Sequence, residues 1–553
     1  MTRPNATLHP AIELSERARL EVVFAVMLAL FLGALDQTVV GVALPTIVAQ
    51  LGGADLYTWT VTAYLLTSTV SIPVYGKLSD LYGRRPLLLA GIAIFLAGSA
   101  LSGLSQDMTQ LILFRAIQGI GAGSLFPIVL AVIGDLFTPA ERGKYQGLFG
   151  AVFGLSAIIG PWLGGFLTER ISWHWIFYVN IPVGLVSMYV IWRILPTVRR
   201  EGASRDIDWL GVATFAAAVV PLMIGLTNAQ TNDWLSAPAG GLIAVAAVFA
   251  LVFAWVELHA KQPIVPFSLF RNRTYALSIV ATFLASFGFF GAIIFLPLWL
   301  QRVQGFTPTE SGWAIFPLLI GLIGGSITAG QIVSRTGRYK WLTVAAMAIM
   351  SAGVFLMTGL HADTPYLPTL GVWMFVTGLG IGPTFAVFTI VVQNAVPFDK
   401  LGVATSNLTF FRQVGGSVGL ALIGTIFGTT LRQELPRQLV ASGVPQDLVD
   451  RFASQGASSQ ALGQTGDVAA TLQRVLPPEL QPLIPAIHHG LDETLSLAIA
   501  SGLWIGLGAV LLALAASVFL PELPLRRTSH AEEMALAAET GFAYPDEKIP
   551  ART

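Results

Sequence analysis

Fourteen long apolar runs are the feature that most constrains how this chain can fold. Their approximate limits are 21–49, 57–76, 87–105, 110–135, 144–168, 174–195, 209–229, 237–257, 275–300, 310–333, 341–360, 366–395, 402–430 and 495–520. About 20 apolar residues in a helix cross a hydrocarbon core of about 30 Å, and lipid admits only helices or closed barrels. Since 54% of the residues are hydrophobic and only 11% are charged, we expect an all-α polytopic membrane protein with fourteen transmembrane helices.

Lysine and arginine are distributed unevenly between the two sides of these spans. If the N-terminus is cytoplasmic, the inside segments hold 23 of the 31 Lys and Arg residues and the outside segments hold six. Cytoplasmic loops carry an excess of these residues. The sequence therefore predicts a multi-pass protein of the cytoplasmic (inner) membrane, with cytoplasmic tails at 1–20 and 521–553.

An internal repeat divides the spans into two groups. The segment Gly76-Lys77-Leu78-Ser79-Asp80 is echoed from Gly330, and glycines 119, 121, 123 and 143 match glycines 378, 380, 382 and 402 at one offset of 259. We expect six-helix halves at 21–195 and 275–520, with two linker helices inserted at 209–257 and an extracytoplasmic loop at 431–494. Paired halves indicate a transporter that works by alternating access. The loop is either a solvated cap or a docking surface for a partner or lipid.

Two charges inside predicted spans are candidates for a function. Asp36 belongs to the first span, and Arg115 to the fourth, with Gln118 one helical turn further on. A charge at the bilayer centre costs roughly 3 kcal/mol or more, so it usually has a function. Asp36 has the chemistry of a proton carrier, because burial and a neighbouring cation shift the acidity of a carboxyl group in opposite directions. The alternatives are that Asp36 is a tether and that Arg115 links helices through backbone carbonyl groups.

Several classes of function find no support in the composition. The chain has no cysteine and a formal net charge of zero, and its seven histidines form no cluster with acids in adjacent spans. We therefore expect no metal, no cofactor, no nucleic-acid partner and no enzymatic activity. A membrane receptor or assembly subunit that transports nothing is a further alternative.

Four sequence motifs together resemble those of the major facilitator superfamily, specifically its fourteen-helix drug:proton antiporter family. They are LDQTVVGVALP at 35–45, GKLSDLYGRRP at 76–86, LILFRAIQGIGAGSLFP at 111–127 and GPWLGG at 160–165, supported by WHWIFYVNIPVG at 173–184 and FFRQVGGSVG at 410–419. The resemblance covers all the predicted spans. It implies a multidrug efflux protein that exchanges protons for hydrophobic or amphipathic compounds, with Asp36 and Arg115 in proton coupling.

The resemblance also implies roles for two groups of residues. The loop after the second span would act as a gate, through Gly76, Asp80, Gly83, Arg84 and Arg85, together with Arg142. The fifth span would carry an antiporter motif, formed by Gly147, Gly160, Pro161, Gly164 and Gly165. The chain departs from the family pattern at Leu81, where a basic residue is frequent, and at Ser156, where glycine is usual. Ser334 replaces Asp80 in the second repeat, which assigns the gate to the first half.

The cargo is less constrained by the sequence. Many aromatic residues in the spans favour a planar, cationic compound, and the candidate cavity residues are Gln37, Gln118, Phe287, Phe290, Asn407 and Arg412. A lipid, a sugar or a metabolite is the alternative cargo. The expected partners are protons, a small amphipathic substrate and membrane lipids, and a periplasmic adaptor or lipoprotein stays open as a further partner.

Overall fold

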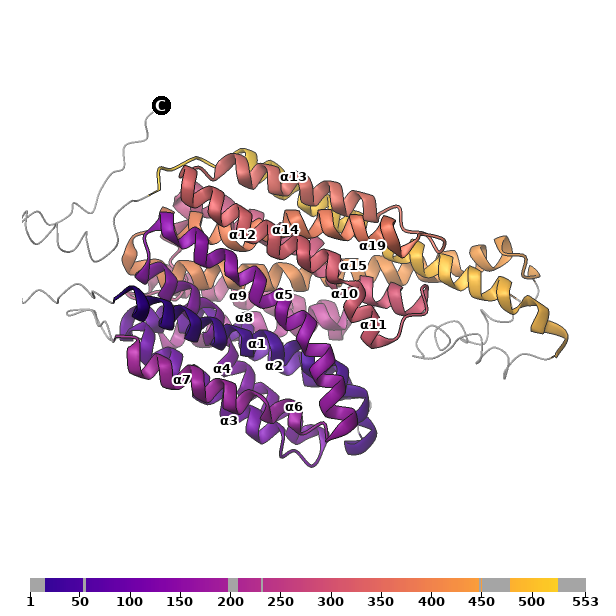
Figure 1. The fold of residues 1–553 in the computed structure, drawn as a ribbon, viewed down its shortest axis with the longest axis horizontal. Helices are drawn as coiled ribbons and strands as arrows, with labels where there is room; N and C mark the ends of the chain where they lie inside the picture. The colour runs from indigo at the N-terminus through magenta and orange to yellow at the C-terminus, as the bar shows by residue number, and fades with distance from the viewer. Residues whose placement is uncertain are drawn as a thin grey trace, which may run out of the picture.

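The computed structural model describes residues 15–52, 56–196, 207–229, 232–446, 449 and 478–525, and the regular elements in these residues are all helices. They lie roughly along one direction in a long bundle (Figure 1). The first half contains α1 (Glu16–Leu51), α2 (Tyr57–Tyr82), α3 (Arg84–Ser102), α4 (Met108–Leu136), α5 (Pro139–Arg170), α6 (Trp175–Tyr178) and α7 (Asn180–Ile194). The inserted pair is formed by α8 (Trp209–Asn228), a π-helical turn at Ala237–Gly241 and α9 (Leu242–His259).

The second half follows a short 3-10 helix at Phe267–Arg271. It contains α10 (Arg273–Arg302), α11 (Pro308–Ala314), α12 (Phe316–Thr336), α13 (Lys340–Met357), a π-helical turn at Tyr366–Leu370, α14 (Gly371–Ala395), a 3-10 turn at Phe398–Lys400, α15 (Leu401–Ala441), a 3-10 helix at Pro478–Leu483 and α19 (Ile484–Val518). We call the end of the bundle where α1 begins and α19 ends the terminal end.

Thirteen helical segments in the described part of the chain are long and apolar enough to cross a membrane. The fourteenth expected span corresponds to α2, which has 26 residues but is rich in serine and threonine. Two of these hydroxyl groups donate to backbone carbonyl oxygens of the same helix. Thr67 Oγ1 donates to the carbonyl oxygen of Ala63 at 2.9 Å, and Ser71 Oγ donates to that of Thr67 at 2.7 Å. Helix α2 therefore lies among the other long helices without unsatisfied hydroxyl groups at these positions.

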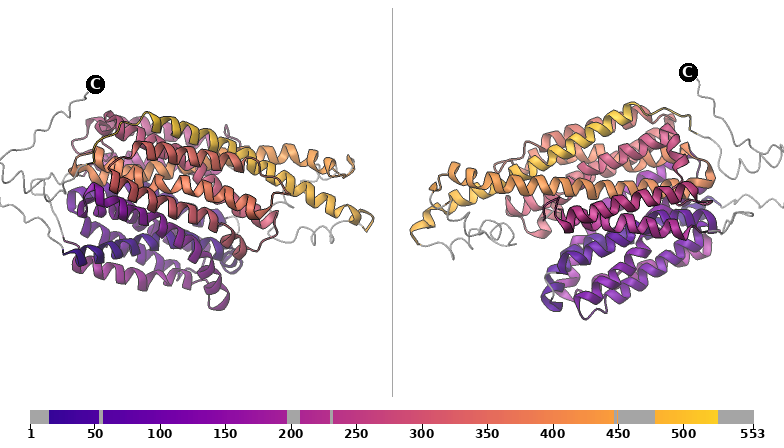
Figure 2. Two further views of the ribbon diagram at one scale, coloured as in Figure 1. Left: turned by 45° about the horizontal axis from the view of Figure 1, so that its top comes forward. Right: turned by 180° about the vertical axis from the view of Figure 1, so that it is seen from behind.

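The inserted pair packs against both halves along one side of the bundle (Figure 2). One apolar cluster joins Ile72 of α2, Phe215 of α8, Phe253 of α9 and Phe410 of α15. The rings of Phe215 and Phe410 lie 5.1 Å apart between centroids. The two linker helices therefore cover the line along which α2 meets α15.

Two boundaries differ from the sequence-based expectation. Helix α1 begins at Glu16, inside the expected 1–20 tail, because Ser15 caps it and Arg17 pairs with Glu21 at 3.0 Å. Helices α15 and α19 extend into the expected 431–494 loop, as the right side of Figure 1 shows. Apolar residues on both extensions bury one another, including Leu435, Leu439, Ile484, Ile487 and Leu491.

Hydropathy did not reveal these extensions because it marks only the lipid-facing part of a helix, whereas a helix continues for as long as it can bury one face. Residues 447–448 and 450–477 of the loop, and 1–14 and 526–553 of the two tails, lie outside the described residues.

Candidate functional site

Asp36 lies deep inside the first half and forms an ion pair with Arg115. Asp36 and Arg115 are each 1% exposed, and Arg115 Nη1 lies 2.5 Å from Asp36 Oδ2. The two residues come from α1 and α4, and Asp36 is 15 residues from the end of α1 at Leu51, or about 22 Å along the helix axis. Both charges were expected inside transmembrane spans, and the structure brings them into direct contact.

Two neutral side chains complete the shell around the carboxylate. Gln118 Nε2 donates to Asp36 Oδ1 at 2.7 Å, and Asn180 Nδ2 donates to the same oxygen at 3.1 Å. Gln118 also accepts a hydrogen bond of 2.8 Å from Arg115. With three donor groups converging on it, Asp36 is held in the geometry of an ionised carboxylate, which accepts hydrogen bonds and donates none.

Arg115 is bound less completely than Asp36. Its guanidinium carbon lies 4.1 Å from the ring centroid of Tyr64 in α2, which is a cation–π contact. The buried Nε atom of Arg115 has no hydrogen-bond partner. Its described hydrogen bonds go to the side chains of Asp36 and Gln118 and not to the backbone carbonyl groups considered above. Loss of the charge on Asp36 would therefore leave the buried guanidinium of Arg115 without a counter-ion among its described partners.

Three members of this cluster, Asn180, Ser99 and Tyr64, were not expected from the sequence. Asn180 begins α7 and also donates to Ser99 Oγ of α3 at 3.1 Å, and Tyr64 supplies the ring under Arg115. Asn180 lies within the WHWIFYVNIPVG motif, so the motif was a signal, but a neutral amide does not stand out in an apolar run. The cluster draws on α1, α2, α3, α4 and α7, all from the first half.

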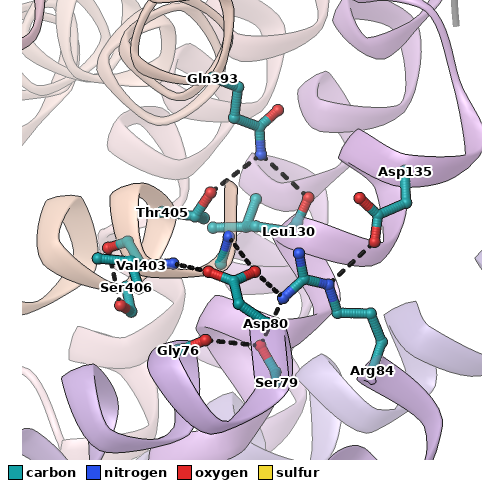
Figure 3. A network of polar contacts seen from close by, with 11 residues as sticks. Gly76, Ser79, Asp80, Arg84, Leu130, Asp135, Gln393, Val403, Thr405 and Ser406 are labelled. Atoms are coloured by element: carbon teal, nitrogen blue, oxygen red, sulfur yellow. Dashed lines mark hydrogen bonds and ion pairs between the residues drawn. The ribbon is translucent and has the colours of Figure 1, made fainter. Parts of the chain in front are cut away.

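A second polar network joins the two halves at the terminal end, as Figure 3 shows. Asp80, near the end of α2, accepts hydrogen bonds from the backbone N–H groups of Gly402 at 3.0 Å and Val403 at 2.8 Å. These residues form the first turn of α15, whose N–H groups have no partner within the helix. The carboxylate therefore caps a helix of the opposite half and meets the positive end of its dipole.

Arg84 holds this carboxylate in place. Arg84 Nη1 lies 2.5 Å from Asp80 Oδ1, and Arg84 Nε lies 2.9 Å from Asp135 Oδ2 on α4. Gly83 is the turn between α2 and α3 and has φ of 93°, which favours glycine. Arg85 is half-buried in the next position. The structure thus places Asp80 and Arg84 in a polar network between α2, α4 and α15, which we call the latch, with Gly83 as the bend that presents Arg84.

Arg142 lies at the same end of the bundle, where it binds the C-terminal end of α4. It is 1% exposed, and its described hydrogen bonds go to the carbonyl oxygens of Phe137, at 2.9 Å, and Gly134. A cation at these carbonyl groups stabilises the C-terminal end of α4. Arg142 thus supports the helix that carries Asp135.

A buried glutamine pair crosses between the halves beside the latch. Gln146 Nε2 of α5 donates to Gln393 Oε1 of α14 at 2.9 Å. Gln393 Nε2 in turn donates to the carbonyl oxygen of Leu130 at 3.1 Å and to Thr405 Oγ1 at 3.2 Å. Gln393 is also drawn in Figure 3. The terminal ends of the halves are therefore joined by uncharged as well as charged hydrogen bonds.

Close backbone contacts occur at two equivalent crossings. Gly76 of α2 faces Gly402 of α15, and a Cβ atom on either residue would lie 2.8 Å from the carbonyl oxygen of the other. Gly143 of α5 faces Gly330 of α12 in the same manner, with even less room. The sequence repeat pairs Gly76 with Gly330 and Gly143 with Gly402. The two crossings are thus related by the repeat, but only the first has the carboxylate of Asp80.

The glycine motif of α5 contacts two different helices. Gly147 packs against Ile327 of α12, whereas Gly160 and Gly164 pack against Thr38 and Val39 of α1. The ring of Pro161 lies beside Gly312, because a Cβ atom added to Gly312 would lie 3.6 Å from the Cβ atom of Pro161. Gly165 faces open space. The close packing expected for this motif therefore involves α1 and α12.

The candidate cavity residues lie in different surroundings. Gln118 belongs to the Asp36 cluster, Asn407 is fully buried and donates to the hydroxyl oxygen of Tyr275 at 3.1 Å, and Phe287 is 6% exposed and packs against Phe283. Gln37 is exposed next to Asp36, and Phe290 and Arg412 are half-buried. The described residues contain no group of three His, Cys, Asp or Glu side chains that could hold a metal ion.

Comparisons with known proteins agree with this architecture. The model of the Major Facilitator Superfamily matches residues 26–420. Multidrug transporter protein MdtP of Bacillus subtilis (strain 168) is 38% identical over 499 residues, covering 88% of this chain and 90% of MdtP. Multidrug resistance protein 3 of the same organism is 38% identical over 406 residues, covering 73% of this chain and 79% of the relative.

A solved structure shows the same fold. The proton:xylose symporter XylE, bound to 6-bromo-6-deoxy-D-glucose, aligns with a TM-score of 0.58 and 11% identity, covering 95% of this chain and 100% of XylE. The fold, the family model and the relatives lead to one conclusion: the chain belongs to the Major Facilitator Superfamily and is a membrane transporter of that superfamily.

Proposed function

We propose that the protein is a proton-coupled antiporter that exports hydrophobic or amphipathic compounds across the cytoplasmic membrane, with both termini in the cytoplasm. The observation that carries the proposal is the buried ion pair between Asp36 and Arg115. Burying a carboxylate in the interior of a membrane protein costs free energy. A proton is the smallest ligand that removes its charge. The names of the relatives, multidrug transporters and efflux pumps, support export of such compounds.

The proton site and the latch share two helices. Helix α4 carries Arg115 near one end and Asp135 at the other, 20 residues further on, and α2 carries both Tyr64 and Asp80. Twenty helical residues span about 30 Å. Protonation of Asp36 would break its ion pair and let α2 and α4 shift, which supports coupling between proton binding and the latch at the terminal end.

The proton gradient supplies enough free energy for this exchange. Each proton contributes about 1.4 kcal/mol per pH unit and about 2.3 kcal/mol per 100 mV of membrane potential. A gradient of one pH unit with 100 mV therefore provides roughly 3.7 kcal/mol per proton, which supports about a 500-fold concentration ratio of an uncharged cargo.

The test is Asp36→Asn in proteoliposomes with a pH-sensitive dye trapped inside and an imposed pH gradient. The cargo is a compound to which the wild-type protein confers resistance in an exporter-deficient bacterium. We expect that the variant is produced and folded normally but loses cargo-dependent proton movement and cargo accumulation.

A matched control is Glu257→Gln. Glu257 is a second buried acid, 3% exposed, whose carboxylate accepts hydrogen bonds from the backbone N–H groups of Ile264 and Val265. This control should retain proton-coupled transport. Normal coupling in Asp36→Asn would refute the proposed role of Asp36.

A further inference from the structure

Arg412 is a second cation in the membrane interior, and it differs from Arg115 in that no carboxylate of the described residues forms an ion pair with it. It lies on α15, 11 residues after Leu401, or about 16 Å from the start of the helix, which is close to the middle of a 30 Å core. Its described contacts are a hydrogen bond from Nη2 to the carbonyl oxygen of Thr384 at 3.4 Å and a cation–π contact with Phe385.

The buried acids in the described parts of the bundle already have hydrogen-bond or ion-pair partners. Asp36 is paired with Arg115, Asp80 with Arg84 and α15, and Glu257 with two backbone N–H groups. None of them is therefore available to balance Arg412. A guanidinium group cannot discharge, so an arginine at this depth remains a positive charge that favours an anion.

Phe385, whose ring lies under Arg412, belongs to a group of five neighbouring aromatic rings. Phe385 of α14 lies 5.6 Å from Phe153 of α5 and 5.6 Å from Phe289 of α10. Phe126 of α4 and Phe290 of α10 extend the group at 5.3 Å and 5.1 Å. The rings come from both halves, and four of the five are half-buried, which leaves part of their surface uncovered. We call these five residues the aromatic cluster.

The aromatic content of the spans favours a cationic cargo only where a ring face is free to receive the cation. The guanidinium carbon of Arg412 lies 4.4 Å from the centroid of Phe385 and occupies that face. A cationic ligand at this ring would have to displace Arg412 and would be repelled by it. The same arrangement attracts a negative group and offers ring surface to a planar body.

We propose that Arg412 and the aromatic cluster bind the anionic group and the planar apolar body of an amphipathic anion, such as an aromatic carboxylate. The inference rests on the proposed export function, and it names the class of cargo. Arg412 would form a charge-assisted hydrogen bond to the carboxylate, while Phe153, Phe289 and Phe385 contact the ring. Since these rings belong to both halves, the ligand would touch each half at once.

The test measures equilibrium binding to the purified full chain in nanodiscs at pH 7.5. The probes are tritiated 2-naphthoate and tritiated 2-naphthylmethylammonium, which share the same ring system and have opposite charges. Wild-type protein should bind naphthoate at least tenfold more tightly than the cation. Arg412→Gln should weaken naphthoate binding by about tenfold to hundredfold, as expected for loss of a hydrogen bond to a charged group, and should not weaken binding of the cation.

Two further variants keep the test decisive. Arg412→Lys keeps the charge but loses the planar fork, so it should weaken naphthoate binding by about threefold to tenfold, and it replaces the glutamine variant if that protein does not fold. Arg335→Gln removes an exposed arginine at the end of α12 and should leave binding unchanged.

Three results would overturn the inference: no naphthoate binding to the wild-type protein, tighter binding of the cation, or unchanged naphthoate binding when Arg412 is replaced in a folded protein. Naphthoate binding is measured at equilibrium and without a pH gradient, whereas proton coupling is measured separately as cargo-dependent proton movement in proteoliposomes. Failure of proton coupling can therefore be distinguished from failure of this site.

Discussion

Replacement of Asp80 by asparagine should release the latch at the terminal end. The side chain is 7% exposed and accepts two backbone hydrogen bonds from α15 in addition to the ion pair with Arg84. Asparagine keeps one acceptor oxygen, but its NH₂ group would face one of the two backbone N–H donors of α15 and could not accept from it. Loss of the charge at a helix N-terminus costs about 0.3–2 kcal/mol, and loss of one hydrogen bond to a charged group costs about 1.5–3 kcal/mol.

Together these losses amount to about 2–5 kcal/mol, so the ratio of closed to open protein should fall by about 30-fold to 5000-fold. Because the chain has no cysteine, two introduced cysteines can be labelled directly. Spin labels at Lys144→Cys on α5 and Arg335→Cys on α12 are exposed and lie on opposite halves. Their distance distribution, measured by pulsed electron paramagnetic resonance, should gain a longer component in Asp80→Asn.

The matched control is Asp107→Asn, which removes an exposed acid that caps α4 within one half through the backbone N–H of Gln110 at 2.8 Å. That variant should keep the short distance. An unchanged distance distribution in Asp80→Asn would contradict the conclusion that this carboxylate holds the halves together.

Two further predictions concern the second crossing and the segment after α19. Gly330→Ala should force α5 and α12 apart at Gly143 and cost about 1–3 kcal/mol, seen as a longer spin-label distance and a lower unfolding temperature; Gly324→Ala on the same helix meets open space and should change neither. Burial raises the pKa of Tyr339 to about 12, and its hydroxyl group donates to the carbonyl oxygen of Pro521 at 2.9 Å and accepts from Leu523 N–H at 2.6 Å. The folded protein therefore holds this proton more tightly than the unfolded chain does. The contribution of Tyr339 to the free energy of unfolding should be complete below pH 10 and should be lost between pH 10 and 12. Tyr339→Phe should lower the unfolding temperature at pH 8 and reduce its decline at alkaline pH, and an identical alkaline decline in both proteins would refute the assignment.

The helices and the central charges could be predicted from the sequence because hydropathy and isolated charges are local signals. Asp36 and Arg115 each stand out in an apolar run. The extension of α15 to Ala441 could not be predicted in this way. Its residues are polar enough to end a hydropathy peak, and their apolar face is recognisable only once α19 lies against it.

The latch shows a different limit of sequence analysis. Asp80 was expected to act with nearby basic residues, and Arg84 does contact it. Its other partners are backbone N–H groups more than 300 residues away, and such groups have no side-chain signature. Gln393 and Asn180 were missed for a related reason, since a neutral amide becomes informative only when the helices around it are placed.

The continuity of α15 has a mechanical consequence. This helix has 41 residues from Leu401 to Ala441 without a break, so it is a rod of about 60 Å. Its first turn is held by Asp80, and its far end projects beyond the bundle together with α19. A tilt of about 10° about the latch would carry Ala441 through about 10 Å, given the rise of a helix. Small rotations of the second half should therefore produce large displacements of the projecting tip. A fluorophore on exposed Val440 would report transport cycles in single molecules.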